Sequence, residues 1–163
     1  MSVIETYVKL WEFERGRTLA LLDSIEESGQ AEEILGWRPG PGRAHIAWQL
    51  MHIGVTEELF ATERLDAGEP DFPQLVSRFK GGSTPDDDIP SVSEIGEVLS
   101  HSREHFLNTI RSFSEDHLSS SPTEFLQGRG WTLETLLQVI AWHEAHHQGQ
   151  AHLTKNLWAQ QNG

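Results

Sequence analysis

Three histidines lie at positions where the helical pattern otherwise has apolar, core-facing side chains. His143 and His147 are four residues apart in the segment 133–159, and His52 lies on the apolar stripe of the segment 44–67. Residues four apart share one face of a helix, so both imidazoles of the pair can reach one metal ion. Buried polar groups need partners. The sequence therefore predicts a divalent cation bound by all three, and the alternative is a metal-free buried polar network.

These histidines must be positioned by segments with helical periodicity, and Gly- and Pro-rich breaks separate one segment from the next. They cover approximately residues 2–27, 44–67, 92–114 and 133–159. Ser91 and Glu94 form a capping box before the third segment, and Thr132 is a candidate N-cap of the fourth. No strand-like alternation stands out. We therefore expect an all-α fold, a four-helix bundle that occupies residues 1–163 as a single domain.

Two local features predict special roles. Residues 69–90 form the longest irregular stretch, and a loop of that length in a small domain is typically functional or mobile. Gly149 interrupts an otherwise favourable helix, where glycine costs about 1 kcal/mol relative to alanine. We therefore expect a neighbouring helix, or a ligand beside the metal, to approach closely at Gly149.

The composition excludes several functional classes. The chain has 163 residues, a formal charge of −13, 37% hydrophobic and 23% charged residues, nine histidines and no cysteine. The acidic balance argues against nucleic-acid binding. No apolar run is long enough for a membrane span, and the N-terminal residues do not form a secretory signal. The absence of cysteine excludes disulfides and thiolate ligands. We expect a cytoplasmic protein.

The segment His143-Glu-Ala-His-His147 also matches the H-E-x-x-H motif of zinc proteases, whose glutamate is the general base. The extended protease pattern places glycine and a third histidine three and six residues after the second ligand. Here Gly149 and His152 follow His147 by two and five residues. The predicted fold also offers no sheet to which a peptide could add as a strand, so we reject the protease interpretation.

Most of the other histidines are predicted to lie away from this centre. His101 and His105 are also four apart, but His101 lies nearly opposite the apolar stripe of its helix, which predicts surface positions for the pair. His45 precedes His52 by one heptad and is expected at the end of the bundle.

The chain resembles the DinB/YfiT-like family of metal-binding four-helix bundles. The matching segments are Trp48-Gln-Leu-Met-His52-Ile, His143-Glu-Ala-His-His147-Gln-Gly-Gln150 and Ser114-Glu-Asp-His-Leu118. The resemblance implies that His52, His143 and His147 are the metal ligands, that the metal is zinc or nickel, and that the protein forms a homodimer. Characterised relatives are transferases and isomerases that use bacillithiol, mycothiol or glutathione, and a few look like hydrolases.

Three neutral imidazoles leave a divalent cation with an open position and an uncompensated charge. A water that ionises near neutral pH or a thiolate can fill that position. Because the chain has no cysteine, a reacting thiol must be a cosubstrate. We therefore expect a metal-dependent transferase that uses a low-molecular-weight thiol on a small-molecule substrate. The alternatives are a metal-dependent hydrolase of a small ester or amide and a non-catalytic metal-binding module. The candidate supporting residues are Glu144, His146, Gln150 and Arg15, the last to hold an anionic substrate group.

Overall fold

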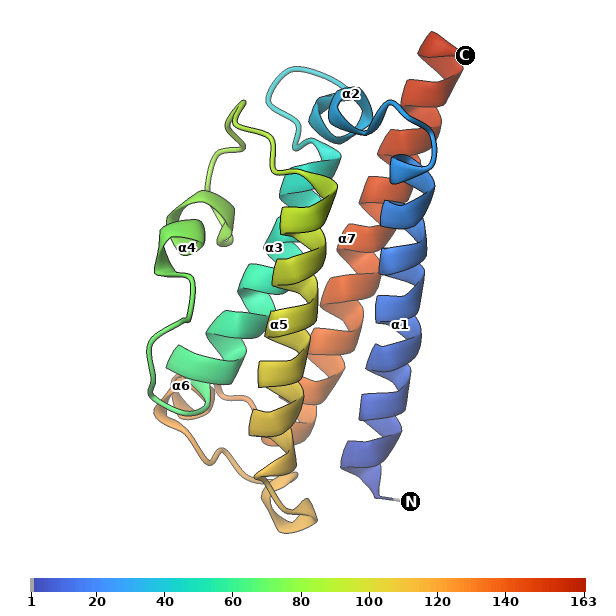
Figure 1. The fold of residues 1–163 in the computed structure, drawn as a ribbon. Coiled ribbons are helices and arrows are strands. Elements are labelled where there is room, and N and C mark those ends of the chain that lie inside the picture. Colours follow the sequence, from blue (N-terminus) through green and yellow to red (C-terminus); the bar gives the residue numbers. More distant parts are fainter. Residues whose placement is uncertain (1) are drawn as a thin grey trace.

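All regular elements of the structure, a computed structural model that describes residues 2–163, are helical (Figure 1). In chain order they are α1 (Val3–Glu26), α2 (Ala31–Gly36), α3 (Ile46–Leu59), the π-helical turn η1 (Phe60–Arg64), α4 (Pro73–Phe79), α5 (Val92–Arg111), the 3-10 turn η2 (Glu115–His117), α6 (Glu124–Arg129) and α7 (Leu133–Asn162). The expected all-α fold is confirmed. Within the described residues, no helix has both the length and the apolar character that crossing a membrane requires.

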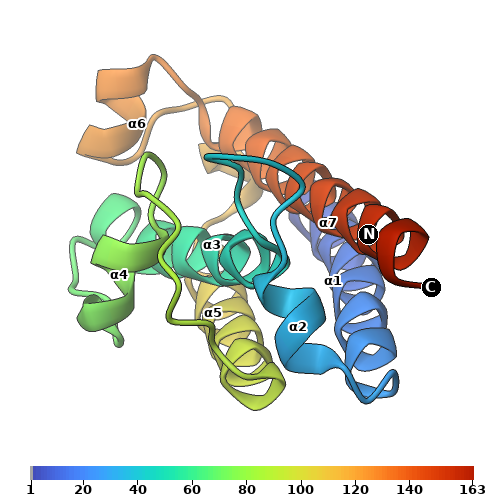
Figure 2. The same cartoon turned by 90° about the horizontal axis from the view of Figure 1, so that it is seen from above.

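The four long helices form a bundle in which each packs against two others. Helix α3 lies between α5 and α7, and α1 also lies between α5 and α7 (Figure 2). Helices α1 and α7 run in one direction, whereas α3 and α5 run in the opposite direction (Figure 1). In chain order, the four long helices therefore run up, down, down and up (Figure 1).

This topology explains the long irregular stretch. Because α3 and α5 run in the same direction, the chain must return along the bundle between them, and a helix of about 20 residues spans about 30 Å. Residues 65–91, which we call the crossover, make this return and carry α4 on the outside of α3 (Figure 2). The length expected at 69–90 is thus required by the connection itself.

The sequence signals for helix starts are confirmed. The Ser91 side chain accepts a hydrogen bond from the Glu94 amide, and the Glu94 carboxylate accepts one from the Ser91 amide. The Thr132 side chain accepts the Thr135 amide at 3.2 Å. Both caps satisfy amides that lack partners in the first turn of a helix.

The start of α3 is capped by a histidine that the sequence pattern placed at the end of the bundle. His45 is fully buried, and its Nδ1 accepts the Trp48 amide at 3.1 Å. Its Nε2 lies 3.0 Å from the Asp86 carbonyl of the crossover. His45 therefore joins the start of α3 to the crossover.

A layer of buried charged residues separates two apolar clusters in the core. One cluster includes Leu22, Ile53 and Leu99, and the other includes Trp11 and Phe106. The layer between them contains buried arginine and glutamate side chains from all four long helices, namely Arg15, Glu57, Arg103 and Glu144. The core of this bundle is therefore polar at mid-height, next to the predicted metal ligands.

The prediction of a neighbouring helix close to Gly149 is wrong. A Cβ atom at Gly149 would meet nothing within 4 Å. The glycine at a close helix contact is Gly54 on α3, where a Cβ atom would lie 2.8 Å from Val98 Cγ1 on α5. Gly54 thus allows α3 and α5 to approach each other, because any larger residue would collide with Val98.

Candidate metal centre

The three predicted ligands, which we call the histidine triad (His52, His143 and His147), converge between α3 and α7. One ring nitrogen from each lies within 4.8 Å of the others, and Nε2 of His143 is 3.1 Å from Nε2 of His52. Nitrogen ligands around a tetrahedral zinc ion lie about 3.3 Å apart, since each Zn–N bond is about 2.0–2.1 Å. The triad therefore offers three imidazole donors that are close enough together for one divalent cation to contact all of them.

Hydrogen bonds hold two of the rings with the same nitrogen turned inward. His52 donates from Nδ1 to the Phe79 carbonyl at 2.6 Å, and His147 donates from Nδ1 to Gln49 Oε1 at 2.5 Å. Both bonds fix the tautomer that leaves the Nε2 lone pair free, as partners behind metal-binding histidines do. Trp48 stacks on His52, with ring centroids 4.7 Å apart. Phe79 ends α4, so the crossover orients a triad residue.

The triad is neutral at physiological pH in the absence of metal. Burial, together with the neighbouring His52, lowers the pKa of His143 to about 3. Burial, together with His143 and His52, lowers the pKa of His147 to about 3. Burial also lowers the pKa of His52. Each ring thus keeps a lone pair available for a cation, which only the neutral form can offer.

Glu144 belongs to a buried ion-pair network next to the triad. Its Oε1 accepts hydrogen bonds from Arg15 Nε at 2.8 Å and from Thr18 at 2.7 Å. Its Oε2 accepts one from Arg103. Glu144 is 1% exposed. The carboxylate therefore does not face the metal centre as a free base, and it holds α7 in place against α1 and α5.

Arg15 is committed to the same network. Its guanidinium contacts Glu57 at 2.7 Å and also donates to the Leu99 carbonyl, and only 6% of the residue is exposed. Burial alone would raise the pKa of Glu57, but Arg15 and Arg103 lie close enough to lower it. Two arginines and two glutamates balance in charge. The guanidinium of Arg15 is thus already bonded to protein groups inside the bundle.

His146 and Gln150 lie at the surface of α7. Both residues are exposed, and Gln150 Nε2 lies 2.7 Å from His146 Nε2. Trp142 stacks on His146 with ring centroids 4.8 Å apart. His146 forms an edge contact with His147 at 5.1 Å. Of the two, His146 therefore borders the triad directly.

Comparison with known protein families decides the assignment of the chain. Residues 10–151, which include the whole triad, match the model described as the DinB superfamily. The chain belongs to the DinB superfamily. The resemblance drawn from the histidine-containing segments is thereby confirmed. A comparison with curated proteins finds no match to this chain.

A cavity adjoins the triad of this DinB superfamily member. Its volume is about 410 Å³, and it lies between the α2–α3 loop and the C-terminal half of α7. Gln49 lines it and also contacts His147, which places the cavity beside the centre. Arg43 supplies its cationic side chain. The cavity can therefore receive a small anionic molecule next to the triad.

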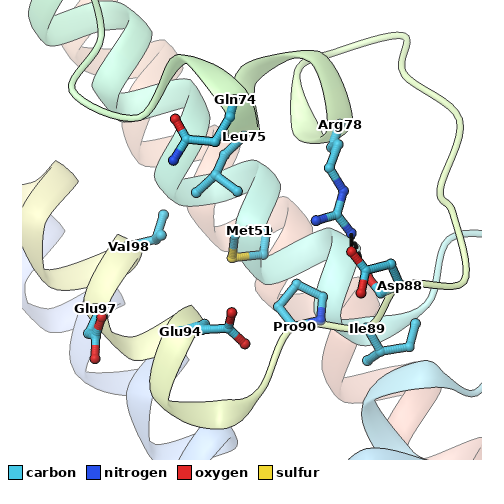
Figure 3. Close-up of a pocket in the computed structure, with 10 residues that line it drawn as sticks. All are labelled: Met51, Gln74, Leu75, Arg78, Asp88, Ile89, Pro90, Glu94, Glu97 and Val98. Atoms are coloured by element: carbon cyan, nitrogen blue, oxygen red, sulfur yellow. Dashed lines mark hydrogen bonds and ion pairs between the residues drawn. The ribbon is translucent and has the colours of Figure 1, made fainter.

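A second cavity of about 250 Å³ lies below α4, between α3 and α5 (Figure 3). Arg78 reaches over it and pairs with Asp88 at 3.1 Å, and Glu94 comes from the opposite wall (Figure 3). Met51 forms its floor, and its lining contains neither a triad residue nor a residue that is hydrogen-bonded to one, whereas Gln49 of the first cavity contacts His147. This second cavity is therefore separate from the candidate metal centre.

Proposed function

We propose that this DinB superfamily protein is a metal-dependent transferase that joins a low-molecular-weight thiol to a small electrophile. The observation that carries the proposal is the convergence of three neutral imidazoles in a chain that has no cysteine. His52, His143 and His147 would hold the cation. A divalent cation there supplies Lewis acidity, which lowers the pKa of a small thiol to the range where it is a nucleophilic thiolate.

The chain's own residues orient the centre and admit the reactants. Gln49 and the Phe79 carbonyl keep the Nε2 atoms of their histidines turned inward. Trp48 covers one face of His52. Arg43, which lines the adjoining cavity, would bind a carboxylate of the thiol or of the substrate. In the reaction a sulfur–carbon bond forms, the bond from carbon to the leaving group breaks with its electron pair, and the thiol proton passes to solvent.

The first test is turnover of a chloronitrobenzene electrophile with bacillithiol, mycothiol or glutathione, with Zn²⁺ or Ni²⁺ added to untagged protein. We expect a rate above the metal-free and protein-free controls. We expect it to fall by a factor of about 100 or more in His143→Ala, because loss of partners behind the ligands alone costs about 10- to 100-fold. His152→Ala, which removes an exposed histidine of the same helix, is the matched control and should keep the wild-type rate.

Arg43→Ala is expected to raise the KM for glutathione about tenfold and to leave kcat nearly unchanged, because a charge-assisted hydrogen bond contributes about 1.5–3 kcal/mol. No rate above background with any of the three thiols would refute the transferase. Metal-dependent cleavage of small esters without a thiol would instead assign the centre to a hydrolase.

A further inference from the structure

A second group of metal-binding side chains lies on the other side of α3 from the triad. It consists of Glu58 on α3, Asp71 in the crossover, and His101 and His105 on α5, and we call it the crossover cluster. One donor atom from each residue lies within 4.8 Å of the others. His101 and His105, which are four residues apart on α5, therefore lie close to carboxylates that their positions on that helix did not predict.

Glu58 is the residue of this cluster that most needs a cation. Its side chain is completely buried. It accepts a hydrogen bond from the Asp71 amide at 2.9 Å and contacts His105 Nδ1 at 3.0 Å. Within residues 2–163, no arginine or lysine pairs with it, whereas the preceding residue, Glu57, pairs with two arginines. A buried carboxylate is costly unless it is paired with a cation or bound to a metal.

The other three members and Glu58 together make a set of four donors. His101 Nε2 lies 2.7 Å from Asp71 Oδ2, and His105 Nδ1 lies 3.8 Å from the same oxygen. These separations bracket the distance of about 3.3 Å expected between ligands of tetrahedral zinc. Two imidazoles and two carboxylates would also neutralise a divalent cation, whereas the triad leaves its charge open.

We propose that the crossover cluster is a second, structural site for a first-row divalent cation such as Zn²⁺, which fastens the crossover to α3 and α5. The side chains of Asp71 and His101 are about half exposed, at 53% and 51%, so the ion has a path from solvent. The four donors would fill the tetrahedral coordination of a structural zinc ion, which would leave no open position for a substrate.

The two sites have no ligand in common. Glu58 follows His52 by six residues, which places it about 9 Å further along α3. The triad is completed by α7, while the crossover cluster is completed by α5 and the crossover. Ligands of one site can therefore be removed while all ligands of the other are kept.

The test is the zinc stoichiometry of untagged, chelator-stripped protein, measured by calorimetric titration and by elemental analysis after gel filtration. We expect two ions per chain in the wild type and one in the double variant Asp71→Asn/His101→Ala, which changes exposed side chains and leaves buried Glu58 intact. We also expect one in His143→Ala/His147→Ala and none when all four changes are combined. Circular dichroism verifies that each variant is folded.

A control and a second measurement sharpen the result. Glu69→Gln/His152→Ala removes an exposed carboxylate of the crossover and an exposed histidine, and it should still bind two ions. Zinc should slow amide hydrogen exchange around Asp71 in the triad variant, but not in Asp71→Asn/His101→Ala.

A single wild-type ion that only the triad variant loses, or two ions that survive Asp71→Asn/His101→Ala, would overturn the second site. A single ion that the triad variant keeps would support the second site and refute the proposed transferase centre. No zinc binding to the wild type would refute both sites.

Discussion

At the scale of single residues, the buried glutamates differ in how their charge is compensated. Glu57 and Glu144 share two arginines, so their negative charges are balanced inside the bundle. Glu14 on α1 lies next to this network without joining it, and its Oε2 is buried without a hydrogen-bond partner within residues 2–163. Burial and the nearby Glu144 raise the pKa of Glu14 to about 7.

This raised pKa predicts a pH-dependent cost to stability. In the unfolded chain Glu14 ionises near its ordinary value of 4.5, so between pH 4.5 and 7 the folded state holds more protons. The contribution of Glu14 to stability therefore falls as the pH rises through this window, and the loss is complete above pH 7.

We expect Glu14→Gln to stabilise the protein at pH 8 by about 1 kcal/mol, less than the full shift implies because Glu14 is partly exposed, and to have little effect at pH 4. Urea unfolding at both pH values measures the difference. Glu12→Gln, at an exposed position of the same helix, is the control. A stabilisation of equal size at both pH values would contradict the assignment.

At the scale of helices, the contact between α3 and α5 depends on the absence of a side chain at one position. Gly54 faces Val98 and Ser102, and an added Cβ would lie 3.3 Å from Ser102 Oγ as well as 2.8 Å from Val98 Cγ1. The same two helices carry three of the four residues of the crossover cluster. Their spacing therefore sets both the packing of the core and the geometry of that site.

Two alanine substitutions in helix interiors should have opposite effects. Gly54→Ala is expected to destabilise the protein by about 1 kcal/mol, because overpacking costs about 1–3 kcal/mol and the gain in helix propensity returns about 1 kcal/mol. Gly149→Ala, which meets open space, is expected to stabilise it by about 0.5–1 kcal/mol. Thermal and urea unfolding of both variants measure the effects. If both substitutions stabilised the protein equally, helix propensity would outweigh packing at Gly54 as well, and the prediction would be wrong.

At the scale of the whole molecule, α3 is the element on which the bundle depends. It packs against α5, α7 and α4, contributes His52 to one cluster and Glu58 to the other, and supplies Glu57 to the charged layer. Cations bound on both sides of α3 would act only on the folded chain, so they should stabilise the bundle as a unit.

We expect saturating Zn²⁺ to raise the Tm of stripped protein, and EDTA to reverse the increase. A site at 100 times its Kd stabilises by about 2.7 kcal/mol, which corresponds to about 5–10 °C for a chain of this size. His143→Ala/His147→Ala and Asp71→Asn/His101→Ala should each lose part of the increase, and the combined variant should lose all of it. An undiminished increase in the combined variant would mean that zinc binds elsewhere.

The amino-acid sequence by itself determined the all-α fold, the helix starts at Ser91 and Thr132, and the inward positions of the three triad histidines. These properties follow from periodicity and capping, which act between residues close together in the chain. The short helices α2, α4 and α6 were not predicted, because each is too short to show an apolar stripe. Local signals were present only at their ends, where Thr123 and Gly130 cap α6 and Pro73 begins α4.

Only the tertiary structure decided which distant residues meet. Arg15 and Glu144 appeared as separate candidates for supporting roles, and the fold joins them in one buried ion pair. The sequence pattern predicts surface positions for His101 and His105, and the return of the chain between the parallel helices α3 and α5 brings Asp71 close to them and to the buried Glu58. Such contacts depend on helix direction and on the path of the crossover, which are set by the packing of the whole bundle and leave no local pattern in the sequence.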